Sequence, residues 1–236
     1  MVTYSSPLIE GRLIKRYKRF LADVELPDGA VVVAHCVNTG SMKTCAEPNS
    51  RVFLTTHNNP KRKLKYTWEL TGVDGGYICV NTSLPNAIVE HAWREKLIPE
   101  LKDYDTCKRE VRYGEKSRID LLLTSDGRPP CYVEVKNVTL IDGDMLRFPD
   151  AKSDRAKKHV LELVKLHEET GARVVMLFVA NRPDGHTMGL AKDIDPAYAS
   201  AVRDALPKGL EILCYRTAIT LEGITIAEPV PFDPSQ

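Results

Sequence analysis

The spacing of apolar and polar positions divides the chain into two parts. Up to residue 82, short apolar runs such as residues 30–37, 51–55 and 76–80 are separated by turn-forming residues. Runs of this length predict short strands, and several of them in succession are typical of a small closed barrel. We therefore expect residues 1–82 to form a barrel of the five-stranded OB type.

Residues 83–236 follow a different pattern, in which helical and extended segments alternate. Helical spacing and capping residues predict helices over residues 86–98, 153–169 and 196–206. Strands are expected over residues 108–113, 118–124, 131–138, 173–180 and 211–215. This order predicts a mixed sheet flanked by helices, so the expected fold class is α/β (α+β), a barrel followed by a second domain.

Three charged residues on two adjacent predicted strands form a candidate catalytic site. A turn over residues 124–130 would bring Asp120 near Glu134, and Lys136 shares a strand face with Glu134. Carboxylate oxygens bind Mg²⁺ or Mn²⁺, and such a metal polarises a phosphate and lowers the pKa of a bound water. The three residues thus predict metal-dependent phosphodiester hydrolysis, with Lys136 positioning the water or offsetting negative charge. The alternative is a solvated strand face with a cross-strand ion pair.

A third carboxylate lies on the preceding predicted strand. Glu110 is a candidate metal ligand beside Asp120 and Glu134, although Arg109 and Arg112 flank it and equally favour an ordinary ion pair.

Four further residues are candidates for phosphate binding. Arg118 lies two positions before Asp120. Arg155, Lys158 and His159 can share one face of the helix predicted over residues 153–169. That face either grips a phosphate or is a solvated basic surface.

The charge of the chain is unevenly distributed. Residues 1–66 carry 11 Lys and Arg against 5 Asp and Glu, whereas residues 67–236 carry 22 against 27. Two segments of the first part combine cations with aromatic residues, which suits phosphates and stacked bases. The first comprises Lys15, Arg16, Tyr17, Lys18 and Arg19, and the second comprises Lys61, Arg62, Lys63 and Lys65 followed by Tyr66 and Trp68. The alternative is that the aromatic residues belong to the core and the cations are only solvated.

Several classes of protein are disfavoured. The sequence has no long apolar run typical of a membrane span and no signal-peptide pattern. Its 6 cysteines lack zinc spacing and lie mostly in apolar stretches, so we expect reduced core residues in a cytoplasmic protein. A nucleophile elbow, a Gly-rich phosphate loop and a helix-turn-helix pattern are also missing.

A series of segments in order along nearly the whole chain resembles one known family. These are residues 13–23, 38–42, 67–70, 78–82, 110–114, 117–120, 132–140 and 148–151, followed by Arg155, Lys158 and His159. With them the chain resembles the sugar fermentation stimulation protein A (SfsA) family. The resemblance implies an OB-like N-terminal domain, a PD-(D/E)xK nuclease-like second domain, DNA binding and a link to sugar metabolism, including maltose use.

The family resemblance also assigns roles to individual residues. It places the nuclease motif on Asp120, Glu134 and Lys136, with Arg-Ile-Asp at the first position where many such nucleases have Pro-Asp. A helix position that is often Gln in these nucleases corresponds to Lys157.

Two functions follow as hypotheses. The first is a Mg²⁺- or Mn²⁺-dependent nuclease acting on nucleic acid, with DNA favoured as the partner. The second is a DNA-binding regulator of sugar metabolism genes that keeps the nuclease fold without cleavage. The intact Asp120, Glu134 and Lys136 favour the first, since paired carboxylates would repel DNA unless a cation lay between them. The sequence leaves open DNA against RNA, the mode of cleavage and whether the protein is a homodimer.

Overall fold

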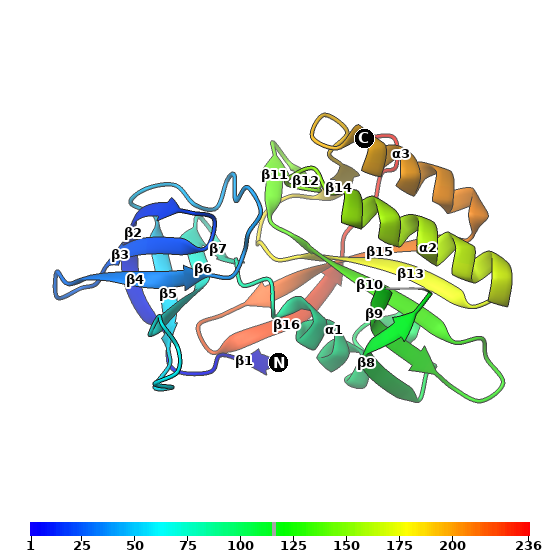
Figure 1. Ribbon diagram of the computed structural model, residues 1–236, viewed down its shortest axis with the longest axis horizontal. Coiled ribbons are helices and arrows are strands. Elements are labelled where there is room, and N and C mark those ends of the chain that lie inside the picture. Colours follow the sequence, from blue (N-terminus) through cyan, green and yellow to red (C-terminus); the bar gives the residue numbers. More distant parts are fainter. Residues whose placement is uncertain (115–116) are drawn as a thin grey trace.

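A computed structural model describes residues 1–114 and 117–236 of the chain (Figure 1). The first domain is a barrel of five strands, as predicted for an OB fold. They are β2 (Ile9–Tyr17), β3 (Leu21–Glu25), β4 (Val31–Cys36), β5 (Arg51–Thr56) and β6 (Tyr66–Val73). The ring runs β4-β3-β2-β5-β6 and closes through parallel pairing of β4 with β6, while β7 (Gly76–Cys79) extends from β6. Closure of the ring removes the exposed strand edges that an open sheet would have.

The second domain contains the predicted mixed sheet and helices. Its helices are α1 (Pro85–Arg94), α2 (Asp154–Thr170) and α3 (Pro196–Ala205), with short 3₁₀ turns at Pro99–Leu101 and Leu206–Lys208. The seven strands of the main sheet have the order β1-β16-β15-β13-β10-β9-β8. They are β1 (Val2–Thr3), β8 (Thr106–Tyr113), β9 (Ser117–Thr124), β10 (Cys131–Val138), β13 (Arg173–Ala180), β15 (Leu210–Ile219) and β16 (Gly223–Pro229). A small sheet adds β11 (Leu140–Asp142), β12 (Met145–Phe148) and β14 (Thr187–Leu190).

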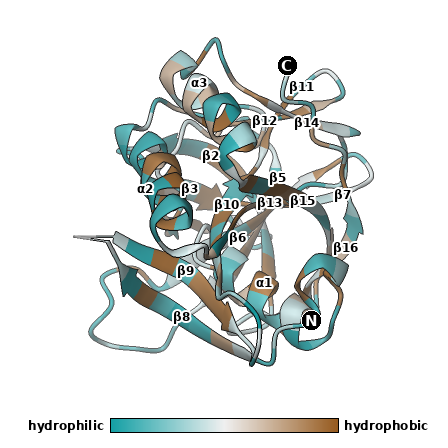
Figure 2. Cartoon of the chain, turned by 90° about the vertical axis from the view of Figure 1, so that its right-hand side faces the viewer, coloured by the Kyte–Doolittle hydropathy of each residue, from teal (hydrophilic) through white to brown (hydrophobic). Residues whose placement is uncertain are grey.

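The main sheet is covered on both faces. Helices α2 and α3 pack on one face, whereas α1 packs on the other, and the central strands between them are strongly apolar (Figure 2). The cluster under α1 also contains Phe53, Leu70 and Cys79 of the barrel. One hydrophobic core therefore spans both domains and fixes the barrel against the sheet.

The sequence prediction differs from the structure at several element boundaries. The helix expected over residues 86–98 ends at Arg94, because Lys96 adopts a left-handed conformation with φ 56°. The strand β1 pairs with β16, so the N-terminus joins the second domain rather than the barrel. The prediction missed β11, β12, β14 and β16, which are short or amphipathic and depend on tertiary pairing.

Other expectations hold for the described residues. Ser153 caps α2 by accepting a hydrogen bond from the Ala156 amide, and Gly171 ends it with φ 68°, as the sequence predicted. All 6 cysteines are free, and every one except Cys107 is buried. Among residues 1–114 and 117–236, no helix is long and apolar enough to cross a bilayer.

Candidate active site

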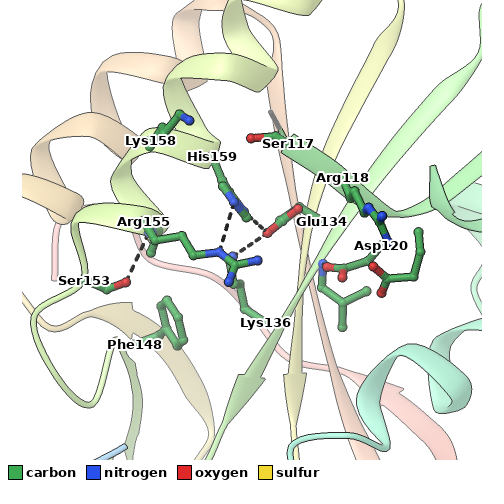
Figure 3. A pocket seen from close by; sticks show the side chains of 13 residues that line it. Ser117, Arg118, Asp120, Glu134, Lys136, Phe148, Ser153, Arg155, Lys158 and His159 are labelled. Atoms are coloured by element: carbon green, nitrogen blue, oxygen red, sulfur yellow. Dashed lines mark hydrogen bonds and ion pairs between the residues drawn. The ribbon is translucent and has the colours of Figure 1, made fainter. Parts of the chain in front are cut away.

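The candidate site lies where β9 and β10 separate. The two strands pair only from Leu121 opposite Val133 to Leu123 opposite Cys131. Beyond this point the backbone pairing between β9 and β10 stops. The Val135 amide of β10 instead donates a hydrogen bond to Oδ2 of the Asp120 side chain at 2.7 Å. A cavity of about 650 Å³ opens beside this point and is lined by Asp120, Glu134 and Lys136. The structure therefore brings the three predicted catalytic residues to one cavity (Figure 3).

The two oxygens of Glu134 have unequal surroundings. Glu134 is buried, with only 3% of its surface exposed. Its Oε1 accepts hydrogen bonds from Lys136 Nζ at 2.7 Å and from His159 Nδ1, whereas its Oε2 is buried without a hydrogen-bond partner among the described residues. A buried oxygen in this state is rare in folded proteins and calls for a functional explanation.

Opposing effects set the pKa values of the two carboxyl groups. Burial raises the pKa of Asp120 above its usual value, and the negative charge of Glu134 adds to this. Burial alone would also raise the pKa of Glu134, but the hydrogen bond from His159 and the charge of Lys136 outweigh it and lower that pKa. Glu134 is thus held as a carboxylate, whereas the ionised form of Asp120 is under electrostatic strain that a cation would relieve.

A polar side chain from α1 holds the other carboxylates. Asn86 Nδ2 donates to Asp120 Oδ1 at 2.8 Å and lies 3.4 Å from Glu110 Oε1. Glu110 lines the cavity and has φ 53°, an uncommon conformation for a residue other than glycine. The structure therefore places Glu110 at the rim of the same cavity. The sequence prediction missed Asn86, and only its place in the first turn of a helix marked it.

Basic residues line the opposite wall of the cavity. Arg155, Lys158 and His159 line it from α2, whereas Arg118 lines the cavity on β9 beside Asp120 (Figure 3). Arg155 Nε points to His159 Nε2 at 3.5 Å, and Lys158 Nζ lies 3.4 Å from Glu162. In the portion of the chain that the structure describes, no carboxylate pairs with Arg118 or Arg155, which leaves their guanidinium groups available to an anion.

Lys157, the residue predicted to correspond to the Gln position, lies away from the cavity. Lys157 is absent from the described lining of the cavity, and the ring of His159 reaches Glu134 instead. The two residues lie on different faces of the helix, since positions two apart do not face the same way, and the correspondence of Lys157 to the Gln position stays a prediction.

The barrel residues predicted to bind nucleic acid lie outside this cavity. Tyr17 donates to Asp23 at 2.9 Å, and Lys15 pairs with Asp23 at 3.6 Å, so both serve the β2–β3 hairpin. Arg16 is turned inward, and its guanidinium donates to the carbonyls of Arg19, Asn38 and Gly40. The expectation that Arg16 presents its charge to a phosphate is therefore corrected, because it clamps a loop.

The second basic segment is an exposed loop between β5 and β6. It contains Lys61, Arg62, Lys63 and Lys65, which lie at the surface. Trp68 next to it is fully buried, and its Nε1 donates to the carbonyl of Leu70 at 2.9 Å. The proposal that Trp68 offers a face for base stacking is wrong, because alternation along β6 directs its ring into the barrel.

The residues of the cavity fit a hard divalent cation with few protein ligands. Among residues 1–114 and 117–236, no group of three or more His, Cys, Asp and Glu side chains is arranged to hold a metal ion. Mg²⁺, however, is often held by one or two carboxylates and retains several waters. The unpartnered oxygen of Glu134 and the raised pKa of Asp120 both fit such a ligand.

Comparison with known proteins identifies both domains. Residues 14–80 match the model described as SfsA N-terminal OB domain, and residues 83–223 match that of Sugar fermentation stimulation protein RE domain. A sugar fermentation stimulation protein homolog from Marinomonas sp. (strain MWYL1) is 50% identical over 233 residues, covering 98% of this chain and 90% of its own. A homolog from Geobacter sulfurreducens is 49% identical, covering 95% and 96%.

A solved structure has the same overall fold. The structure of Pyrococcus furiosus SfsA in complex with Ca²⁺ superposes with a TM-score of 0.88 at 28% sequence identity. The match covers 98% of each chain, so the arrangement of the two domains is shared.

Proposed function

This chain belongs to the sugar fermentation stimulation protein (SfsA) family, and from that premise we propose that it is a metal-dependent nuclease that hydrolyses phosphodiester bonds in DNA. The observation that carries the proposal is the unequal use of Glu134, whose buried Oε2 has no partner in the described structure. This side chain lines one cavity with a second carboxylate and with several cations. A purely structural carboxylate would have both oxygens satisfied.

Asp120 and Glu134 are the residues that would hold the cation, with Glu110 as a third candidate ligand at the rim. Carboxylate oxygens suit Mg²⁺ and Mn²⁺, and the Ca²⁺ in the Pyrococcus furiosus relative supports a divalent ion. When bound, such an ion polarises the phosphate and lowers the pKa of a coordinated water.

The remaining residues of the cavity have distinct roles. Lys136 Nζ, already 2.7 Å from Glu134 Oε1, would orient the attacking water and offset the charge that develops on the phosphate. Arg155 and Arg118, which have no carboxylate partner within the described residues, would bind the non-bridging phosphate oxygens. His159 would hold Glu134 in one orientation through its Nδ1 hydrogen bond.

Cleavage of labelled nucleic acid tests the proposal. End-labelled single-stranded and double-stranded DNA and RNA are incubated with Mg²⁺, Mn²⁺ or EDTA. The wild type is compared with Glu134→Gln and with Glu168→Gln, a matched control because Glu168 is exposed near the far end of α2. We expect cleavage that needs the metal, is lost in Glu134→Gln and is kept in Glu168→Gln.

Two results would contradict the nuclease. One is the absence of cleavage with either metal, and the other is equal cleavage by the wild type and Glu134→Gln. Salt-sensitive binding of the same oligonucleotides without cleavage would then support a DNA-binding protein that regulates sugar metabolism genes.

A further inference from the structure

A second cavity lies between the two domains and adjoins the candidate active site. It measures about 310 Å³ and is lined by Asn38–Gly40 of the barrel and by Asn137, Thr139 and Lys152 of the second domain. Phe148 and Ser153 line both this cavity and the active-site cavity. The two cavities therefore meet at these side chains and form one groove that leads from Glu134 to the barrel.

The barrel side of this groove is held in place by Arg16 and Asp150. The guanidinium of Arg16 donates to the carbonyls of Asn38 and Gly40, both at 2.9 Å. Asp150 of the second domain packs so closely on Gly40 that a β-carbon there would overlap its carboxylate, and it accepts from the Met42 amide at 3.4 Å. The loop is thus fixed against the second domain, and a larger residue at position 40 would force the side chain of Asp150 to move.

Arg182 fixes the two domains to each other. It is 3% exposed and donates to Thr44 Oγ1 of the barrel at 3.1 Å and to the carbonyl of Thr139. Its charge is balanced by Asp184, whose Oδ2 lies 2.8 Å away. Because a buried and paired cation holds both walls, the groove is a preformed feature of the fold.

The side chains along the groove suit a single strand of nucleic acid. Arg19 and Lys152 are exposed cations on opposite walls, and amide and hydroxyl side chains lie between them. The hydroxyl and amide groups are those of Asn38, Thr39, Thr82, Asn137, Thr139 and Ser153. The lining also contains the carboxylate of Asp150, which accepts hydrogen bonds from Ser41 Oγ and the Met42 amide, both at 3.4 Å. Cations bind the phosphates of a strand, while neutral polar groups bind sugars and base edges without a charge requirement.

Phe148 offers a stacking surface at the junction of the two cavities. Its ring is held by Phe178 and Tyr198, with centroids 5.6 and 5.4 Å away. The side chain is only half-buried, and its free surface points into the groove (Figure 3). Stacking of a base on such an aromatic face is tolerant of sequence and contributes substantially to single-strand binding.

We propose that this groove binds the single-stranded segment next to the scissile phosphate, with Arg19 and Lys152 on its phosphates and Phe148 stacked on a base. The inference rests on the proposed function, since it takes the scissile phosphate to lie at Asp120 and Glu134. The volume of the second cavity is that of a small-ligand site and accommodates one or two nucleotides rather than a duplex. The enzyme is thereby specific for single-stranded regions, such as ends and overhangs.

Binding without metal tests the groove separately from cleavage. The affinity of the full chain for a fluorescent single-stranded oligonucleotide, DNA or RNA, is measured by anisotropy in EDTA at several salt concentrations. We expect Arg19→Ala and Lys152→Ala each to weaken binding several-fold and to reduce the slope of log K against log salt by about 0.7. Lys208→Ala, a matched control at an exposed lysine after α3, should change neither quantity.

Phe148→Leu tests the stacking surface. Loss of base stacking should weaken single-strand binding about 5-fold to 100-fold with little change in salt slope. Photo-cross-linking with 5-iodouracil in the strand should label Phe148 in the wild type. If Phe148→Leu does not fold, the cross-link to Phe148 in the wild type and the two charge variants, Arg19→Ala and Lys152→Ala, still test whether the groove binds the strand.

These measurements distinguish strand binding in the groove from the proposed nuclease activity. Wild-type affinity in both charge variants, or cross-links confined to residues 57–65 of the barrel, would overturn the groove even if the protein cleaves DNA. Loss of binding in the charge variants with a cross-link at Phe148 would support the groove even if no cleavage is found. Equal affinity for single strands and blunt duplexes in all variants would also contradict it.

Discussion

Two buried glutamates, one in each domain, have opposite surroundings. Glu69 on β6 is 5% exposed, and each of its oxygens accepts one hydrogen bond, from Thr55 Oγ1 at 2.6 Å and from Asn81 Nδ2 at 2.7 Å. Glu134 on β10 is 3% exposed, yet one oxygen accepts two hydrogen bonds and the other none in the described structure. Burial of a carboxyl group alone therefore does not mark a functional site. The unsatisfied oxygen beside a cavity is what distinguishes Glu134 from Glu69, and it supports the proposed site.

The largest effect that would follow from this difference concerns cleavage. We expect Glu134→Gln to lower the rate of metal-dependent DNA cleavage by about 10³-fold or more, because a neutral amide is a poor ligand for Mg²⁺. Glu69→Gln should retain the rate within about 3-fold, since it lies in the barrel. Initial rates of cleavage at saturating Mg²⁺ measure the effect of each variant. Similar losses of rate in Glu134→Gln and Glu69→Gln would contradict the distinction between the two glutamates.

Removal of the cation beside Glu134 should have the next largest effect. Lys136→Met should lower the cleavage rate by about 10²-fold to 10³-fold through loss of charge stabilisation. The charge of Lys136 lowers the pKa of Glu134, so its removal raises that pKa. The acid limb of the pH–rate profile should consequently move to higher pH, because metal ligation needs the ionised carboxylate. An unchanged limb would argue against coupling of these two groups.

We expect Glu69, the buried glutamate of the barrel, to contribute to folding stability rather than to cleavage. Glu69→Leu leaves the amide of Asn81 and the hydroxyl of Thr55 without acceptors, at a cost of about 2–3 kcal/mol in the free energy of unfolding. Urea denaturation followed by fluorescence measures this change. Thr55→Val should cost less, because it leaves only one oxygen of Glu69 without its donor. A stability equal to that of the wild type in both variants would contradict the structural role.

The smallest expected effect distinguishes Asp120 from an ordinary structural carboxylate. Its folded-state pKa is raised, so ionisation costs folding stability as pH rises through the unfolded and then the folded pKa. Asp120→Asn should therefore stabilise the metal-free protein at neutral pH and lose this advantage below the unfolded pKa. Thermal denaturation at pH 7 and below pH ~3.5, in EDTA, measures the difference. Equal stabilisation at both pH values would show that the pKa shift is not its cause.

Local pattern was sufficient for much of the fold and for part of the site. The spacing of apolar residues located β13 and the ends of α2, and strand alternation put Glu134 and Lys136 on one face. Pattern failed where a residue's environment depends on distant segments. Trp68 follows a basic loop but points into the barrel, and Arg16 lies among exposed cations but clamps a loop from another strand pair.

The sequence alone predicted a small barrel followed by a mixed sheet and brought together the three candidate catalytic residues Asp120, Glu134 and Lys136, because strand period and short turns act between near neighbours, while the resemblance to a family supplied the type of each domain. The tertiary structure decided which polar groups meet. It brought Asn86 of α1 to Asp120 and His159 of α2 to Glu134, and it placed Phe148 at the junction of the two cavities. These contacts depend on how helices and the barrel pack across the sheet. No local pattern encodes that packing, because it is set by the shape and burial of surfaces that are far apart in the chain.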